Sequence, residues 1–234
     1  MNIVITGASN GIGFELAKKF SANADNQVVG IARSGEKLQQ LSSEINSVSN
    51  GGHFYPVCFD LSLPDYTAKL LPEILKHIPT IDILINNAGL LINKPFEKLT
   101  DVDFDHTFDV NVKAPFRLIR DLLGNFSQPA HVVNITSMGG VQGSSKFAGL
   151  SLYSSAKGAL AILTECLAEE LADKKICVNA LALGAVQTEM LAKAFPGYLA
   201  PLSPKQMAGF ISEFALTGHH FFNGKILPVS LSTP

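Results

Sequence analysis

The feature that most limits the fold of this chain is the regular alternation of short apolar segments with longer segments of helical periodicity. Apolar runs typical of buried strands cover residues 2–6, 27–32, 53–59, 81–85, 131–135, 176–181 and 225–229. The segments between them repeat apolar residues every three or four positions and are predicted helices: 11–24, from Ser34 through Ile45, 65–77, 102–126, 152–173 and from Ser203 onwards. This order predicts an α/β fold, a doubly wound parallel sheet of about seven strands with helices on both faces.

The low charge of the chain agrees with strands that are covered on both faces. Hydrophobic residues make up 47% of the sequence and charged residues only 16%, which is below the usual fraction. The formal net charge of −2 provides no overall field that would draw the chain to nucleic acid or to an anionic membrane. Because the chain contains no repeat, linker or low-complexity segment, we expect one domain over residues 1–234.

Cysteine use and the amino terminus predict a cytoplasmic protein. Cys58, Cys166 and Cys177 are odd in number and widely spaced, so we expect buried free thiols and no disulfide framework. The first residues lack the basic segment and the long apolar run of a signal peptide. The longest apolar tracts fall far short of the roughly 20 residues of a membrane span. The six histidines show no metal-ligand spacing, and no metal is expected.

A glycine-rich segment, Thr6-Gly-Ala-Ser-Asn-Gly-Ile-Gly13, ends the first predicted strand and opens the first predicted helix. Glycine permits positive φ and close approach of a ligand, and free N–H groups at a helix N-terminus attract a pyrophosphate. The alternative is an ordinary strand-to-helix turn, but the strand–turn–helix context favours a dinucleotide site. The residues predicted to bind the cofactor in this loop are Gly7, Ser9, Asn10, Gly11, Ile12 and Gly13.

The ends of the next two strands indicate which dinucleotide binds. A carboxylate after the second strand would hold a ribose 2′-hydroxyl, whereas an arginine accommodates a 2′-phosphate. This chain has Arg33-Ser34 at that place and no carboxylate, so we predict NADP(H) in preference to NAD(H). The alternative is a solvated surface arginine. After the third strand, Asp60 is placed where it could hold the adenine amino group.

Motifs in the same order resemble those of the short-chain dehydrogenase/reductase family, whose sheet is of the Rossmann type. After the glycine loop come Asp60-Leu61, Asn86-Asn-Ala-Gly89, Asn134-Ile-Thr-Ser137, Tyr153-x-x-x-Lys157, and Asn179 with residues 184–188. Each motif is weak alone, but together they span almost the whole chain. The resemblance implies further cofactor contacts from Leu61, Asn87, Ala88, Gly89, Tyr153, Lys157, Val186 and Thr188.

The resemblance also implies a catalytic set of Asn111, Ser137, Tyr153 and Lys157. Tyr153 and Lys157 are four residues apart on one predicted helix and therefore share a face. A free tyrosine has a pKa of about 10, and we expect the Lys157 ammonium to lower the pKa of Tyr153 toward neutrality.

In the family's reaction, Tyr153 would act as general acid/base while hydride passes between nicotinamide and a carbonyl or alcohol carbon. Ser137 would hydrogen-bond the substrate oxygen, and Asn111 would hold a water that links Lys157 to solvent. Without the resemblance, Ser137 would be an ordinary turn residue and Asn111 a surface residue.

Three departures from the family pattern bear on the site. Leu183 replaces the proline usual before Gly184, and we expect it to loosen the turn that covers the nicotinamide. Sixteen residues separate Ser137 from Tyr153, about three more than usual, and the extra residues are expected to reshape substrate access. The tail, residues 227–234, lacks the common Asp-Gly-Gly.

Apolar residues near the predicted site favour a small carbonyl or alcohol substrate with an apolar body. They are Leu90, Leu91 and Ile92 after the fourth strand, and Met190, Leu191, Phe195 and Tyr198 within the loop or small helix at 185–200. The same residues could simply pack a lid. In this family, helices like those at 102–126 and 152–173 commonly form a dimer face, and Ala156, Ala159 and Ala161 would permit close packing, so a homodimer or homotetramer is expected.

The rival prediction from another class is a dinucleotide-binding regulatory or scaffold protein without turnover. The complete catalytic set argues against it. A methyltransferase on a related sheet is disfavoured by the Tyr153–Lys157 pair and by the Asn86–Gly89 segment, and the chain has no Gly-x-Ser-x-Gly elbow of a hydrolase.

Overall fold

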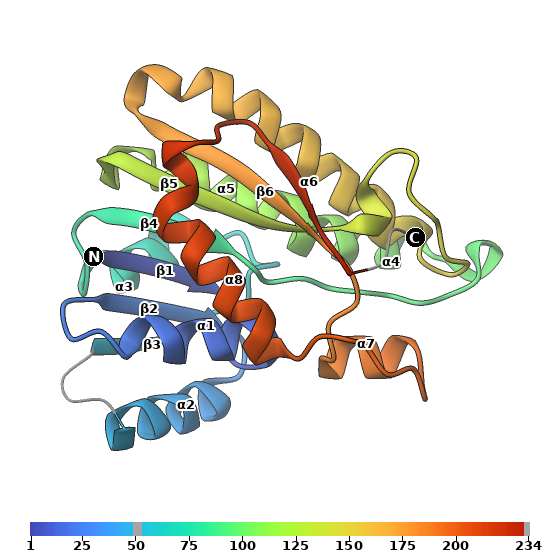
Figure 1. The fold of residues 1–234 in the computed structure, drawn as a ribbon, viewed down its shortest axis with the longest axis horizontal. Coiled ribbons are helices and arrows are strands. Elements are labelled where there is room, and N and C mark those ends of the chain that lie inside the picture. Colours follow the sequence, from blue (N-terminus) through green and yellow to red (C-terminus); the bar gives the residue numbers. More distant parts are fainter. Residues whose placement is uncertain (49–52, 232–234) are drawn as a thin grey trace.

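Seven parallel strands form one sheet in the computed structural model, which describes residues 1–48 and 53–231 (Figure 1). In chain order they are β1 Asn2–Thr6, β2 Gln27–Ala32, β3 His53–Cys58, β4 Ile81–Asn86, β5 Phe126–Ser137, β6 Ile176–Leu183 and β7 Ile226–Val229. Across the sheet the order is β3-β2-β1-β4-β5-β6-β7, with every neighbouring pair parallel. The predicted doubly wound α/β sheet is confirmed.

Helices connect the strands and cover both faces of the sheet (Figure 1). They are α1 Gly11–Ser21, α2 Gly35–Val48, α3 Leu71–Leu75, α4 Asp101–Phe108, α5 Ala114–Asp121, α6 Ser151–Glu170, α7 Glu189–Ala194 and α8 Pro204–Thr217. Serine side chains cap two of these helices. Ser34 Oγ accepts a hydrogen bond from Lys37 N at the start of α2 (3.3 Å), and Ser203 forms a capping box with Gln206 at the start of α8.

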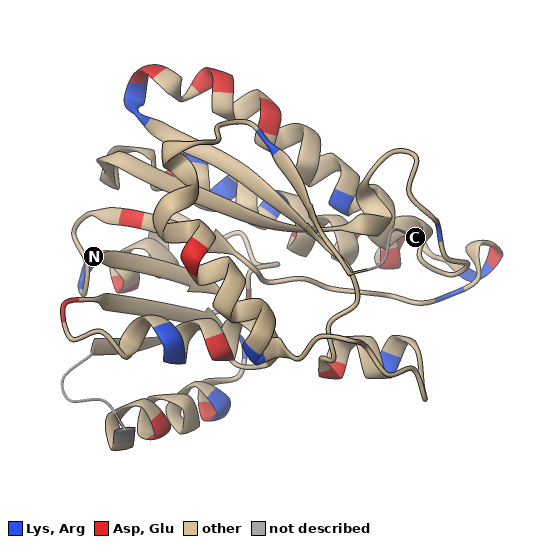
Figure 2. Cartoon of the chain, in the orientation of Figure 1, with Lys and Arg blue, Asp and Glu red and all other residues tan. Residues whose placement is uncertain are grey.

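Alternation of side chains along the strands builds two cores, one on each face. Ile3 and Ile5 of β1 pack with the apolar faces of α1, α2 and α8, whereas Val4 packs on the other side with α3, α5 and the end of α6. Asp82 is the only Asp, Glu, Lys or Arg in the seven described strands. Figure 2 shows the other charges spread over helices and loops, which leaves both faces of the sheet free for apolar packing.

Two predicted helices are each interrupted by a wider, π-helical turn. The predicted helix at 65–77 consists of the π turn Tyr66–Leu70 and α3, and the predicted helix at 102–126 consists of α4, the π turn Asp109–Lys113 and α5. Pro72 and Pro115 have no N–H, so the carbonyl four residues earlier in each case loses its α-helical donor. The second segment also ends early, because β5 begins at Phe126.

The cysteines are free thiols, but the expectation that they are buried is wrong. Cys58 and Cys166 are exposed and Cys177 is half-buried. Cys58 lies on β3, the edge strand of the sheet, and Cys166 lies on the outer side of α6. Within the described part of the chain, no helix has the length and apolar character needed to cross a membrane. Residues 232–234 of the atypical tail lie outside the described residues.

A buried histidine, His131 of β5, makes the fold sensitive to acid. It is 1% exposed, and its ring nitrogens contact Ala215 O at 2.9 Å and Asn179 Nδ2 at 3.1 Å. The pKa of His131 is lowered from 6.5 to about 4, mainly by burial and to a smaller extent by the nearby His219 and His220, against the opposing effect of the hydrogen bond to Ala215 O.

We therefore predict that the free energy of unfolding falls as the pH drops from about 6.5 toward about 4. In that window His131 binds a proton in the unfolded chain but stays neutral in the folded chain. This difference lowers the free energy of unfolding by up to roughly 3 kcal/mol. Urea unfolding at neutral pH and near pH 5 measures the change. In His131→Gln the pH dependence should be smaller, and an unchanged pH dependence in this variant would contradict the assignment to His131.

Candidate active site

The glycine loop forms the turn from β1 into α1 with the geometry that the sequence predicts. Gly7 and Gly11 have positive φ values of 71° and 56°. Asn10 caps α1, and its side-chain oxygen accepts a hydrogen bond from Gly11 N at 2.8 Å. Of the loop's predicted cofactor residues, Ser9, Asn10 and Gly11 line a cleft of about 360 Å³, whereas the side chain of Ile12 packs on the core.

A set of hydrogen bonds joins this loop to the end of β4. Thr6 Oγ1 accepts from the backbone N–H groups of Asn87 and Ala88, both at 3.0 Å, and Asn87 Nδ2 donates to Thr6 O at 2.9 Å. The polar groups predicted to contact the cofactor at Asn87 and Ala88 therefore hold the glycine loop in place. Gly13 completes the contact, because a Cβ there would lie 2.6 Å from Asn87 Nδ2 and 2.8 Å from Gly7 C.

The residues that follow β2 and β3 include the arginine predicted to bind the 2′-phosphate and the aspartate predicted to hold the adenine. The Arg33 side chain is exposed and has no hydrogen bond or ion pair within residues 1–48 and 53–231. Asp60 Oδ1 accepts from Ser62 N (2.9 Å) and Ser62 Oγ (2.8 Å), which orders the turn after β3. Leu61, also predicted to contact the cofactor, has its side chain buried in the core.

Lys157 and Asn111 meet at Gly89, the residue at which the segment after β4 leaves the sheet. A Cβ on Gly89 would lie 3.2 Å from Asn111 Oδ1 and 3.5 Å from Lys157 Nζ, so both side chains lie close against this glycine. Asn111 is fully buried, accepts from Leu90 N (3.3 Å) and donates to Leu90 O (2.8 Å) and Thr107 O (2.9 Å). It lies in the π turn before Pro115, not in a regular helix as expected.

Tyr153 and Ser137 lie beside Lys157. Lys157 Nζ is 5.7 Å from the centroid of the Tyr153 ring and donates a hydrogen bond to Ile135 O of β5 at 2.8 Å. Ser137 is the last residue of β5, its hydroxyl is hydrogen-bonded to Tyr153, and it also accepts from Gly139 N at 3.2 Å. The four residues predicted to be catalytic are therefore brought together at the carboxyl edge of the sheet.

The pKa shift expected for Tyr153 is wrong in direction. Burial raises the pKa of Tyr153 from 10.0 to about 12, against the opposing effect of the hydrogen bond with Ser137. Lys157 is 3% exposed, and burial lowers its pKa from 10.5 to about 8. The sequence shows that the two side chains share a helix face, but it does not show how far both are removed from water.

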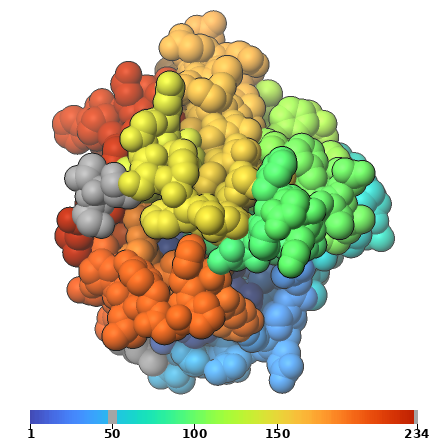
Figure 3. Space-filling view, turned by 90° about the vertical axis from the view of Figure 1, so that its right-hand side faces the viewer, coloured from blue at the N-terminus to red at the C-terminus, as the bar shows by residue number. Residues whose placement is uncertain are grey.

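Three segments surround a hollow above these residues, which Figure 3 shows with N-terminal atoms visible at its base. They are the segment after β4, the longer Ser137–Tyr153 connection, and the segment that contains α7. Each contacts the other two: Asn93 Nδ2 donates to Ala194 O (2.7 Å), Lys94 N donates to Gly149 O (3.0 Å), and the Phe147 and Phe195 rings pack edge to face. The longer connection after Ser137 thus takes part in the rim of the hollow through Phe147 and Gly149.

The segment after β6 lies over the glycine loop. Thr188 caps α7 and lines the cleft, and a Cβ on Gly11 would be 3.3 Å from Thr188 Cγ2. The side chain of Val186 is 5% exposed and packs in the core. The loosening expected at Leu183 is not seen, because this buried residue extends β6 and is paired with Ser137 and Val229. Asn179 lies within β6, where it contacts His131 and Phe222 O, and not in the covering segment.

Several residues that support or line the site were assigned no individual role from the sequence. Asn86, Asn134 and Thr164 form a buried hydrogen-bonded row, with Asn86 Nδ2 to Asn134 Oδ1 at 2.8 Å and Asn134 Nδ2 to Thr164 Oγ1 at 2.9 Å. This row ties β4 and β5 to α6, the helix of Tyr153 and Lys157. Lys37 and Glu189 line the cleft with the glycine loop but belong to no motif. Among the described residues, no group of three or more His, Cys, Asp or Glu could hold a metal ion.

A Rossmann-type sheet that carries a glycine loop after its first strand defines a dinucleotide-dependent class of protein. The family model for short chain dehydrogenases matches residues 1–198. The chain belongs to the short-chain dehydrogenase/reductase family and is an NAD(P)-dependent oxidoreductase.

Individual relatives agree with this assignment. The chain is 29% identical to the versicolorin reductase of Emericella nidulans, over 97% of this chain and 92% of that protein. It is 32% identical to the 3-oxoacyl-(acyl-carrier-protein) reductase of Aquifex aeolicus, over 81% of this chain and 75% of the relative. Among solved structures, the 3-ketoacyl-(acyl-carrier-protein) reductase of Brucella melitensis complexed with NADH is 28% identical, with a TM-score of 0.85 and coverage of 98% and 96% of the two chains.

The contact at Gly13 generates a test of the glycine loop. We predict that Gly13→Ala lowers the free energy of unfolding by about 2 kcal/mol or more, because its Cβ has no room between Gly7 and Asn87. Gly209→Ala is the matched control, since Gly209 lies in α8 with no atom within 4 Å of its Cβ position, and alanine should stabilise the helix by about 0.5–1 kcal/mol. Urea unfolding measures both, and equal effects of the two variants would contradict the tight contact.

Proposed function

We propose that this chain is an NADP(H)-dependent oxidoreductase that transfers hydride between nicotinamide and a carbonyl or alcohol substrate, with Tyr153 as general acid/base. The observation that carries the proposal is the convergence of Ser137, Tyr153, Lys157 and Asn111 beside Gly89. These side chains come from β5, α6 and the π turn before α5, and they lie at the edge of the sheet where such folds bind ligands.

The chain's own groups fit a dinucleotide between the cleft and this cluster. The cleft borders the glycine loop, and Lys157 has three ammonium hydrogens, of which the bond to Ile135 O uses one. Lys157 is therefore able to hydrogen-bond a ribose hydroxyl beside Gly89. When bound, the nicotinamide supplies or accepts the hydride.

The raised pKa of Tyr153 favours its role as an acid. With a pKa of about 12, the phenol holds its proton at neutral pH and can donate it from Oη to a carbonyl oxygen during reduction. Ser137 Oγ lies next to that proton and would hydrogen-bond the same substrate oxygen as charge develops on it. Asn111 would act at a distance, because its bonds to the backbone of Leu90 fix the segment that holds Gly89 against Lys157. In the role predicted from the resemblance, Asn111 also holds a water that links Lys157 to solvent.

A 2′-phosphate is the cofactor feature that Arg33 would recognise. The guanidinium is exposed at the end of β2, and Ser34 lies next to it at the cap of α2. No carboxylate follows β2 directly to hold a ribose 2′-hydroxyl. Both features support NADP(H) over NAD(H).

The rim of the hollow supports an apolar substrate body. Leu90, Leu91 and Ile92 are half-buried after β4, and Phe147 and Phe195 pack together across the rim. The relatives named above are reductases, which agrees with a carbonyl substrate.

The exposed surface of α4, α5 and α6 supports assembly into a homodimer or homotetramer. It carries four large apolar side chains that are 40–61% exposed: Val102, Phe104, Phe116 and Ile162. The small residues predicted for this contact behave differently, because Ala156 and Ala161 are buried within the subunit. We propose that Ile162 and the phenylalanines form the contact instead.

The alternative is a dinucleotide-binding scaffold without turnover. A scaffold has no need for a buried Lys157 with a lowered pKa beside a protonated Tyr153, and keeping Lys157 buried costs stability. This arrangement favours the enzyme.

We predict that Tyr153→Phe lowers the rate of NADPH consumption with carbonyl substrates by roughly 10²–10⁴-fold, because the proton donor is lost. NADPH affinity should change little. Tyr55→Phe is the matched control, since it removes a hydroxyl that bonds Gln27 on the far side of β1 (2.7 Å). The measurement is the loss of NADPH absorbance over a panel of apolar ketones. Tight NADPH binding with no turnover of any ketone by the wild-type chain would favour the scaffold.

Arg33→Ala should weaken NADPH binding by about tenfold or more and leave NADH binding nearly unchanged, because only the 2′-phosphate interaction is lost. Arg120→Ala removes an equal charge from the exposed side of α5 and serves as the control. Fluorescence titration of both cofactors gives the affinities. Equal loss for NADH and NADPH in Arg33→Ala would contradict the phosphate assignment.

A further inference from the structure

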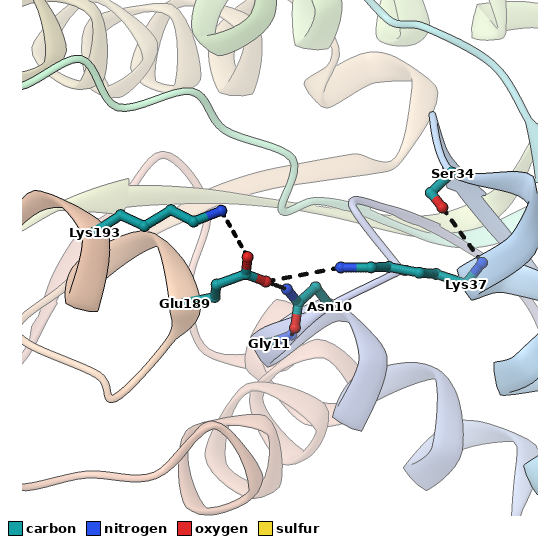
Figure 4. Close-up of polar contacts among 6 residues, drawn as sticks. All are labelled: Asn10, Gly11, Ser34, Lys37, Glu189 and Lys193. Atoms are coloured by element: carbon teal, nitrogen blue, oxygen red, sulfur yellow. Dashed lines mark hydrogen bonds and ion pairs between the residues drawn. The ribbon is translucent and has the colours of Figure 1, made fainter.

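One carboxylate crosses the cofactor cleft. Glu189, the first residue of α7, receives a hydrogen bond from Asn10 Nδ2 of the glycine loop, and its Oε2 lies 3.7 Å from Lys37 Nζ on α2 (Figure 4). Its other oxygen, Oε1, pairs with Lys193 Nζ of α7 at 2.6 Å. Asn10, Lys37 and Glu189 all line the cleft, whereas Lys193 does not. Glu189 therefore connects the segment over the substrate hollow with both walls of the cofactor cleft.

The donors around Glu189 Oε2 form an anion site. An amide N–H group and an ammonium, from two elements far apart in the sequence, point at one oxygen, as Figure 4 shows. The pKa of the Glu189 carboxyl lies below its usual value, first because of the hydrogen bond from Lys193 and then because of the one from Asn10, and Lys37 adds a smaller effect. The carboxylate thus occupies a place in which a phosphate oxygen would find the same partners.

The position of Lys37 relates this anion site to Arg33. The backbone N–H of Lys37 donates to Ser34 Oγ (3.3 Å). The backbone of Lys37 therefore lies close to the end of β2, where Ser34 follows the arginine proposed for the 2′-phosphate. Its side chain then extends across the cleft toward Asn10 (Figure 4). Lys37 lies in the first turn of α2, four residues after Arg33, and Arg33 has no acidic partner in the described part of the chain.

We propose that Lys37 is a specificity-determining residue that binds the 2′-phosphate together with Arg33, and that Glu189 competes with the phosphate for Lys37. The inference rests on the proposed NADP(H) dependence. A 2′-phosphate displaces the carboxylate from Lys37, and a cofactor with a 2′-hydroxyl leaves the pair in place. Glu189 thereby lowers the affinity for the phosphorylated cofactor and couples its binding to the position of α7.

Calorimetric titration with adenosine 2′,5′-bisphosphate and with 5′-AMP tests the proposal without turnover. In Lys37→Gln the bisphosphate should bind about tenfold more weakly, with 5′-AMP unchanged, and Lys37→Arg should retain most of the affinity. Lys19→Gln is the charge-matched control, because Lys19 lies on α1 outside the lining of the cleft and pairs weakly with Glu213 (3.9 Å).

Competition predicts a second, coupled effect. Glu189→Gln should tighten bisphosphate binding about threefold or more in the wild-type background and have no effect in the Lys37→Gln background. A gain of equal size in both backgrounds, or no gain in either, would overturn the competition.

The outcomes separate this inference from the proposed function. If Arg33→Ala weakens bisphosphate binding while Lys37→Gln does not, the NADP(H) preference stands and the role of Lys37 is overturned. If the wild-type chain binds the bisphosphate no more tightly than 5′-AMP, the NADP(H) preference itself fails, and the inference fails with it.

Discussion

The contact between the glycine loop and the end of β4 is the constraint on which the site depends. β1 and β4 are neighbours at the centre of the sheet, where the chain reverses the direction in which it adds strands. Thr6 Oγ1 accepts hydrogen bonds from the backbone N–H groups of Asn87 and Ala88. The loop and Asn87 approach so closely at Gly13 that no side chain would fit there. Because Gly89 follows directly, this contact fixes the distance between the dinucleotide loop and the Lys157–Asn111 pair.

Around that fixed point, buried polar groups keep α6 in register with the sheet. The Asn86–Asn134–Thr164 row and the bond from Lys157 to Ile135 O join α6 to β4 and β5. Buried polar groups are costly unless they are paired, so an alternative docking of α6 would leave several of them without partners. The arrangement brings Tyr153 to Ser137 in an environment that keeps its phenol protonated.

Much of the fold and the order of the site could be predicted from local signals. Apolar runs located the strands, and polar or glycine residues directly after each run marked the edge where the site lies. The interruptions of the two helices could have been predicted as well, because Pro72 and Pro115 each remove a backbone donor at a known position. The direction of the Tyr153 pKa shift could not, since burial depends on the packing of distant segments. The same holds for Lys37 with Glu189 and for Phe147 with Phe195, which meet only after the sheet has formed.

The central claim is that the cluster at Gly89 donates a proton from Tyr153 to a carbonyl group that would receive its hydride from bound NADPH. The most direct measurement is the transfer of deuterium from NADPH labelled at nicotinamide C4 to an apolar ketone, followed by mass spectrometry of the product. The account predicts an alcohol that carries one deuterium on the former carbonyl carbon, formed only with protein that retains Tyr153. Saturable NADPH binding without deuterium in any product of a broad ketone panel would contradict it.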